Sequence, residues 1–176
     1  MEIALLTQPP QLHLLTGPRR PVGRLAHQAL ARAAQAGPVY VLDCGGRFDG
    51  YGVARLLGGD RAALERVTVA RAFTCFQALA LLRRPAPGGA LVLALDLPAT
   101  FQDENVAYGE RTLLLERSIT ALEELARGAA VLVTAAAGAG RGAAAGGWAL
   151  ERLQRAAGRT WRLEPAGPDA WQPGLL

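Results

Sequence analysis

Short apolar runs alternate with longer stretches of helical periodicity along this chain, and this alternation is the strongest constraint on its fold. Several runs are apolar at consecutive positions, as in strands that helices cover on both faces. Strands that alternate with helices predict an α/β fold with a mainly parallel sheet. The expected strands are 11–15, 39–43, 67–70, 90–96, 129–134 and 160–164, and the expected helices are 22–36, 75–84 and 110–127.

Glycine, proline and a capping threonine mark the limits of these helices. The pair Gly37-Pro38 ends the first, with Gly37 suited to a left-handed cap, while Thr74 is the expected N-cap of the second. The segment 135–147 is almost entirely Ala and Gly, too rich in glycine for a stable helix, and is interpreted as a mobile loop. We expect one core domain over residues 1–164 and a Pro-rich C-terminal tail over residues 165–176.

Composition excludes several classes of protein. With 2 cysteines, 2 histidines and no metal-spaced motif, the chain offers no zinc site of the usual kind. No apolar run reaches the ~18 residues of a membrane span, so we expect a cytoplasmic protein without membrane contact. The single serine, Ser118, falls inside an expected helix, which rules out a serine nucleophile elbow. The net charge of +4 permits a nucleic-acid or acidic partner without requiring one.

Six segments, taken in chain order, resemble the ATPase core of the RecA-like recombinases, including the archaeal and eukaryotic branch. They are HLLTGP (13–18), VYVLDCGGRFDGYGVARL (39–56), RVTVARAFTCFQALALL (66–82), ALVLALDLPATF (90–101), GERTLLLERSITALEELARGAAVLVT (109–134) and GGWALERLQRAAGRTWRLE (146–164). The resemblance covers most of 11–164. It implies a three-layer RecA-like P-loop NTPase fold, with a mainly parallel central sheet flanked by helices, that binds ATP between protomers of a filament or ring.

The phosphate-binding motif of this family is altered in the chain. A working loop reads G-x-x-x-x-G-K-[ST], in which Lys neutralises phosphate oxygens and the hydroxyl holds Mg²⁺. After Thr16-Gly17 comes an expected Pro/Arg/Gly turn without a Lys-Ser or Lys-Thr pair. Aligned from Gly17 without a gap, Lys becomes Gly23 and the hydroxyl becomes Arg24; with one inserted residue, Gly23 keeps its place and Arg24 replaces Lys. Pro18 and Pro21 also remove two amide donors.

The water-activating carboxylate of the family is missing too. In VLDCGGRF the family's Glu falls on Gly45, which has no side chain to accept a proton. No catalytic residue and no metal ligand set is therefore predicted, and the resemblance implies a pseudo-ATPase. No cofactor is predicted, although binding of ATP with Mg²⁺ stays open as an alternative.

The residues that would still bind a nucleotide or another anion lie at the carboxyl ends of strands and at the start of the first helix. Asp96 has two interpretations, a water-mediated Mg²⁺ ligand or the cap of a neighbouring loop. The arginines either bind an anion at the helix N-terminus or form a solvated turn. The candidate residues are Thr16, Gly17, Arg19, Arg20, Gly23, Arg24, Asp43 and Asp96.

Two further groups have structural and functional interpretations. In RAFTCF, we expect Arg71 to pair with a carboxylate and Phe73 to enter the core, and we expect Trp148 and Trp161 to anchor the core. The family's two DNA loops correspond to about 99–110, which is acidic, and 135–147, which holds a single cation. The candidate DNA-binding residues are Arg141, Arg152, Arg155 and Arg159, which are otherwise a solvated face.

The leading hypothesis is a non-hydrolysing RecA-like accessory protein. It would serve as an interaction or regulatory subunit in DNA repair, recombination or a related process, with a protein partner or by self-association. One alternative is a divergent ATP-binding ATPase that uses Arg24 and Asp96. The other is a DNA-binding module that uses the C-terminal arginine cluster.

Overall fold

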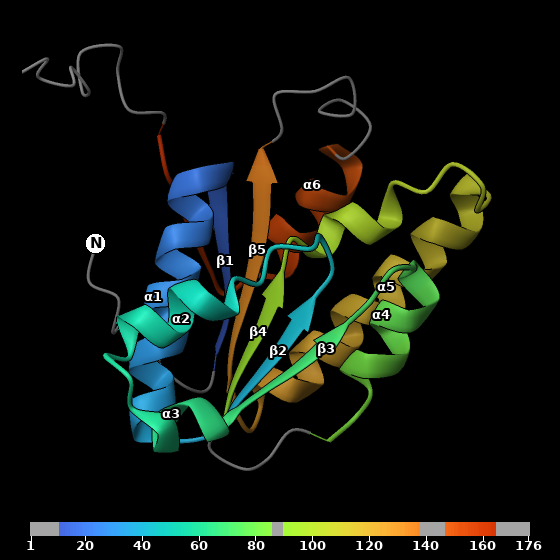
Figure 1. Ribbon diagram of the computed structural model, residues 1–176. Coiled ribbons are helices and arrows are strands. Elements are labelled where there is room, and N and C mark those ends of the chain that lie inside the picture. Colours follow the sequence, from blue (N-terminus) through green and yellow to red (C-terminus); the bar gives the residue numbers. More distant parts are fainter. Residues whose placement is uncertain (1–10, 86–89, 138–146, 165–176) are drawn as a thin grey trace, which may run out of the picture.

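The computed structural model describes residues 11–85, 90–137 and 147–164 and forms a sheet between two layers of helices (Figure 1). The strands are β1 (Gln11–Pro18), β2 (Val39–Asp43), β3 (Val67–Arg71), β4 (Leu91–Leu95), β5 (Ala130–Ala137) and β6 (Arg159–Arg162). The helices are α1 (Arg19–Ala36), α2 (Gly50–Leu56), α3 (Arg61–Glu65), α4 (Cys75–Leu82), α5 (Tyr108–Ala126), α6 (Gly147–Ala156) and the short 3-10 helix η2 (Leu97–Phe101).

The six strands are all parallel, in the order β3-β2-β4-β5-β1-β6. Every residue of β4 is buried, as the unbroken apolar run predicts for a strand covered on both faces. β1 lies between β5 and β6, and its pairing with β5 runs from Gln11 opposite Ala130 to Pro18 opposite Ala137. The prediction of a mainly parallel α/β sheet is confirmed.

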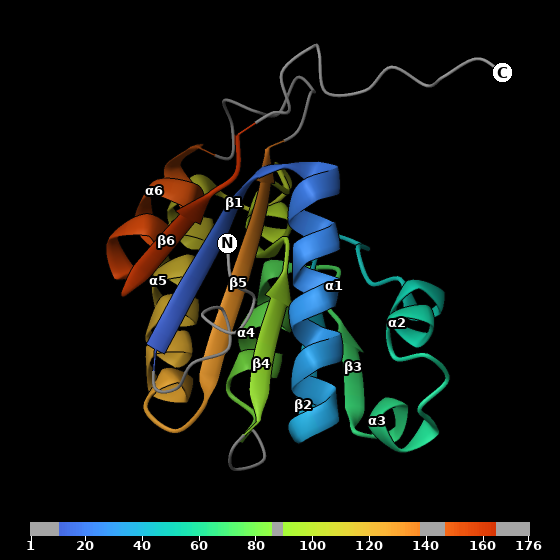
Figure 2. The ribbon, with the colours of Figure 1, turned by 90° about the vertical axis from the view of Figure 1, so that its left-hand side faces the viewer.

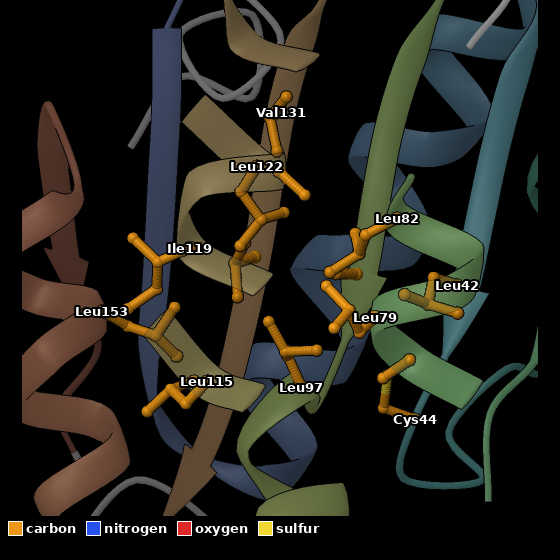
Figure 3. Packing of buried hydrophobic residues seen from close by; sticks show 14 of the residues in the cluster. Leu42, Cys44, Leu79, Leu82, Leu97, Leu115, Ile119, Leu122, Val131 and Leu153 are labelled. Carbon is orange, nitrogen blue, oxygen red and sulfur yellow. The ribbon is translucent and has the colours of Figure 1, made fainter. Parts of the chain in front are cut away.

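Each face of the sheet carries its own hydrophobic core. The helices α1, α2 and α3 cover one face, and α4, α5 and α6 cover the other (Figure 2). On the second face, leucines of α4, α5 and α6 converge on β2 and β5 (Figure 3), and each fully buried Leu contributes ~1.5–3 kcal/mol. The side chains that show this packing most clearly are Leu42, Leu79, Leu82, Leu115, Leu122, Val131 and Leu153.

Local capping explains where several helices begin. The hydroxyl of Thr74 accepts a hydrogen bond from the amide of Gln77 (3.2 Å), which confirms Thr74 as the N-cap of α4. Asp49 and Asp60 cap α2 and α3 in the same way, and these two short helices were not expected. Gly37 ends α1 in an extended conformation (φ −174°) and not in the expected left-handed one.

The Ala/Gly-rich segment 135–147 differs from its prediction at both ends. Residues 135–137 belong to β5, because their backbone pairs with residues 16–18 of β1, and residue 147 begins α6. Residues 138–146, including Arg141, lie outside the described residues, as does the expected tail over residues 165–176.

Candidate functional site

The junction between β1 and α1 has no loop. β1 continues through Thr16, Gly17 and Pro18, and α1 begins at the next residue, Arg19. The expected Pro/Arg/Gly turn after Gly17 is therefore wrong. Pro18 completes the ladder with β5, and the residues from Arg19 to Gly23, where the turn is expected, form the start of α1.

Gly17 is required by a close contact between backbones. Its φ is +139°, and a Cβ atom here would lie 2.5 Å from the carbonyl oxygen of Leu163. The amide of Leu163 donates to the carbonyl oxygen of Thr16 (2.8 Å), and the Thr16 hydroxyl donates to the carbonyl oxygen of Trp161 (3.4 Å). Thr16 and Gly17 thus hold the chain that follows β6 against β1.

The first turn of α1 has few free amide donors. In a helix the first four N–H groups lack intrahelical partners, and here these positions are Pro18, Arg19, Arg20 and Pro21. Because proline has no N–H, two donors remain. The side chains of the two arginines are exposed, and α1 has no side-chain cap and no acidic residue in its first turn.

Gly23 and Arg24 both lie within α1, beyond its first turn. A Cβ atom on Gly23 would meet no atom within 4 Å, so this glycine does not serve a close approach. The side chain of Arg24 is exposed. Neither residue is held toward the carboxyl ends of β2 and β4 by any contact of the described residues.

Asp43, at the end of β2, is fully buried and hydrogen-bonded. Its Oδ1 accepts from the amide of Arg47 (2.7 Å), and its Oδ2 accepts from the amide of Phe48 (3.4 Å) and from Nε of Arg71 (3.2 Å). The predicted carboxylate partner of Arg71 is confirmed as Asp43. Both oxygens fix the loop 44–48, and Oδ2 also binds Arg71.

Phe73 does not enter the core as expected. Its side chain is 74% exposed, although the neighbouring Ala72 is buried. The amide of Ala72 donates to the carbonyl oxygen of Asp43 (3.0 Å), and the amide of Phe73 donates to Oε1 of Gln77 (2.8 Å). These bonds set the backbone so that the ring of Phe73 points into solvent.

Asp96 lies after the end of β4 and is also engaged on both oxygens. Oδ1 accepts from the amide of Ala136 (3.2 Å), and Oδ2 accepts from Nε of Arg47 (3.1 Å) in an ion pair. Its amide donates to the hydroxyl of Thr134 (2.8 Å), and its backbone is left-handed (φ 53°). Sequence reasoning missed Arg47, because nothing in the local pattern pairs it with a carboxylate 49 positions away.

Gly45 is pressed against the same carboxylate. A Cβ atom on Gly45 would lie 2.7 Å from Oδ2 of Asp96, closer than side chains tolerate. The position where the resemblance places a water-activating Glu therefore has no room for a side chain in this arrangement. Burial, together with the charges of Asp43 and Asp96, raises the pKa of the neighbouring Cys44 thiol, which keeps it protonated and unreactive.

Each of the three candidate DNA-binding arginines that the structure describes has an acidic or aromatic neighbour. Arg152 pairs with Glu116 and stacks on the Trp148 ring (5.7 Å to its centroid), while Arg155 lies 3.9 Å from Glu151. The third, Arg159 on β6, lies over the ring of Trp161, 5.2 Å from its centroid. The two tryptophans are half-buried and pack against the two cores, so they are anchors at the margin of each core.

The six-stranded parallel sheet with helices on both faces is a RecA-like α/β fold. Among solved structures, the crystal structure of the RadB recombinase is similar to this chain with a TM-score of 0.64 and 17% sequence identity, covering 92% of this chain and 77% of that one. No protein-family model matches the sequence, and no curated protein matches it.

Two further findings concern the described residues alone. None of their helices combines the length and apolar character that crossing a bilayer requires. Nor do they bring three or more His, Cys, Asp or Glu side chains together in a group that could hold a metal ion.

Proposed function

We propose that this chain is a non-hydrolysing RecA-like accessory protein, an interaction or regulatory subunit in DNA repair, recombination or a related process. The observation that carries the proposal is the ion pair between Arg47 and Asp96, over which Gly45 is closely packed. At the carboxyl edge, where α/β sheets bind their ligands, the chain supplies its own cation to the carboxylate.

Phosphoryl transfer depends on positioned amides, a cation on the outer phosphates and a metal ion held by oxygen ligands. In this chain the backbone of Thr16, Gly17 and Pro18 pairs with β5 in the sheet, and the guanidinium of Arg47 neutralises Asp96. A metal ion at Asp96 would have to replace a hydrogen-bonded arginine that lies within the same fold. These features support a site that keeps the fold of a nucleotide-binding protein without its chemistry.

The divergent-ATPase alternative has less support. It needs Arg24 and Asp96 to act on one ligand, but Arg24 is exposed on α1 and Asp96 is engaged by Arg47 and Ala136. The DNA-binding alternative also has less support, because Arg152 and Arg155 have acidic neighbours and the ring of Trp161 covers one side of Arg159.

Calorimetric titration of the purified chain with Mg-ATP, followed by a phosphate-release assay, tests the proposal. We expect no binding heat at millimolar ATP and no release above the protein-free rate. Micromolar binding with turnover that is lost in both Arg24→Ala and Asp96→Asn would overturn the proposal in favour of the ATPase. Asp60→Asn is the matched control for changes in stability. It also removes the charge of a carboxylate, but Asp60 caps α3 and takes no part in the Arg47–Asp96 ion pair.

A titration with labelled single-stranded DNA tests the third hypothesis. We expect weak binding that disappears with added salt and does not depend on sequence. Tight binding that is lost when Arg152, Arg155 and Arg159 are replaced together by Ala would instead establish a DNA-binding role.

A further inference from the structure

Two phenylalanines project into solvent at the start of α4. Phe73, just before the helix, is 74% exposed, and Phe76, in its first turn, is 47% exposed. Ala80 is also exposed, and residues three and four apart lie on the same side of a helix. The opposite side of α4 is buried in the core through Cys75, Ala78, Leu79 and Leu82. Phe76 and Ala80 therefore share the exposed side of α4, and Phe73 lies just before the helix; these three residues are called the stripe.

The backbone that presents these rings is fixed. The amide of Gln77 donates to the Thr74 hydroxyl (3.2 Å), while Oε1 of Gln77 accepts from the amide of Phe73 (2.8 Å). The pair is similar to a capping box, except that the Gln77 side chain accepts from the amide of the residue before the N-cap, and it defines the entry of the chain into the helix. A ring held in water on a fixed backbone loses little conformational freedom when a partner covers it.

Charge is distributed unevenly around the stripe. Between Glu65 and Asp96 the sequence has no acidic residue and four arginines, of which Arg83 and Arg84 are exposed at the carboxyl end of α4. The acidic residues Asp103 and Glu110 act on Cys75, at the amino end of the helix. The two exposed arginines thus place positive charge beyond Ala80, where it would attract an acidic group.

We propose that Phe73, Phe76, Ala80, Arg83 and Arg84 form a docking surface for an amphipathic helix of a partner protein. Apolar residues of that helix cover the two rings, and its acidic residues face the two arginines. The segment from Phe76 to Arg84 is nine residues long, so a partner helix of a few turns, at ~1.5 Å per residue, matches its length. This surface is the contact through which the accessory protein proposed above would bind its partner, so the inference rests on that proposed function.

The test uses the full chain and two fluorescein-labelled 18-residue peptides in an anisotropy titration. Both peptides carry Leu on one face of a helix; one carries Glu on the other face, and its matched counterpart carries Lys. We expect the Glu peptide to bind at least tenfold more tightly, and Phe73→Ala to weaken it about 30-fold, as for a hot-spot residue. The double variant Arg83→Glu, Arg84→Glu should reverse the preference between the two peptides.

Tyr51→Ala is the matched control, because Tyr51 is an aromatic residue of α2 that is 85% exposed. It should leave the affinity unchanged, and circular dichroism should show that all variants are folded. Absence of binding, equal binding of both peptides, or an affinity insensitive to Phe73→Ala would overturn the proposal. Self-association that depends on Phe73, measured by sedimentation, would assign the surface to a second copy of the chain and overturn it as well.

The two proposals fail separately. The peptide titration contains no nucleotide, so a failure there leaves the Arg47–Asp96 arrangement and its interpretation unaffected. Conversely, ATP turnover would refute the proposed function without changing the affinity for the Glu peptide.

Discussion

Replacing Gly45 with alanine adds one methyl group where the loop 44–48 meets Asp96. The new Cβ atom would lie 2.7 Å from both Cβ and Oδ2 of Asp96, whereas contacts under 3.0 Å are essentially never seen for real Cβ atoms. Either the loop or the carboxylate must move. Since Arg47 donates to Oδ2 of Asp96 from the same loop, a shift of either one lengthens the ion pair.

The free energy of unfolding should fall by about 3–5 kcal/mol. Overpacking a well-packed site costs ~1–3 kcal/mol, and a lost hydrogen bond to a charged group adds ~1.5–3 kcal/mol. The total is a large part of the ~5–15 kcal/mol that stabilises an ordinary domain. For a chain of this size, ~1 kcal/mol corresponds to a shift in Tm of ~2–4 °C, so the melting temperature should fall by more than about 6 °C.

Urea unfolding followed by far-UV circular dichroism measures the effect, with Gly46→Ala as the control. Gly46 is left-handed (φ +64°), but its Cβ atom would meet nothing within 4 Å. Its variant should therefore lose only the ~1–2 kcal/mol that a side chain costs in this conformation. If Gly45→Ala were as stable as the parent to within ~0.5 kcal/mol, the loop would not press on Asp96, and the reasoning for a closed site would be refuted.

Three further predictions use the same unfolding assay. Gly23→Ala should raise the free energy of unfolding by ~0.5–1 kcal/mol, because the residue is helical with open space around it; a loss would contradict this assignment. Gly17→Ala should cost more than ~2 kcal/mol, because its Cβ atom would lie 2.5 Å from the carbonyl oxygen of Leu163 at a φ of +139°, and an unchanged stability would contradict it. Burial raises the pKa of the Cys44 thiol in the folded chain. The contribution of this thiol to the free energy of unfolding should therefore be constant below the ordinary thiol pKa of ~8.5. Above that pH the free energy of unfolding should fall by up to ~1.4 kcal/mol per pH unit. The slope should be shallower in Cys44→Ala, and equal slopes would show that this thiol does not contribute.

The sheet could be predicted from sequence because its strands carry their signal locally. The run 39–43 is apolar, ends in an aspartate and is β2 with the same limits. The three long helical patterns correspond to α1, α4 and α5, with ends that differ by at most three residues. Periodicity sets which residues face the core, so these elements needed no knowledge of their neighbours.

The candidate site could be predicted only in part, because its contacts join distant segments. That Asp43 and Asp96 end neighbouring strands follows from the pattern, but the cation on Asp96 comes from Arg47, and its amide partner Ala136 belongs to a segment expected to be a loop. The ring of Phe73 was misassigned for a related reason. A hydrophobic residue beside a strand is normally buried, but here the hydrogen bonds of Gln77 to Phe73 and Thr74 hold the backbone with the ring exposed.

The placement of β1 affects how the chain folds during its synthesis. The first described strand pairs only with β5, which begins at Ala130, and β6, which begins at Arg159. The ribosome therefore completes β2, β3 and β4, which neighbour one another in the sheet, long before β1 has a partner. Such long-range pairing is slow and exposes unpaired strand edges. We expect the nascent chain to hold a half-formed sheet and to require shielding of β1 until β5 and β6 have been synthesised.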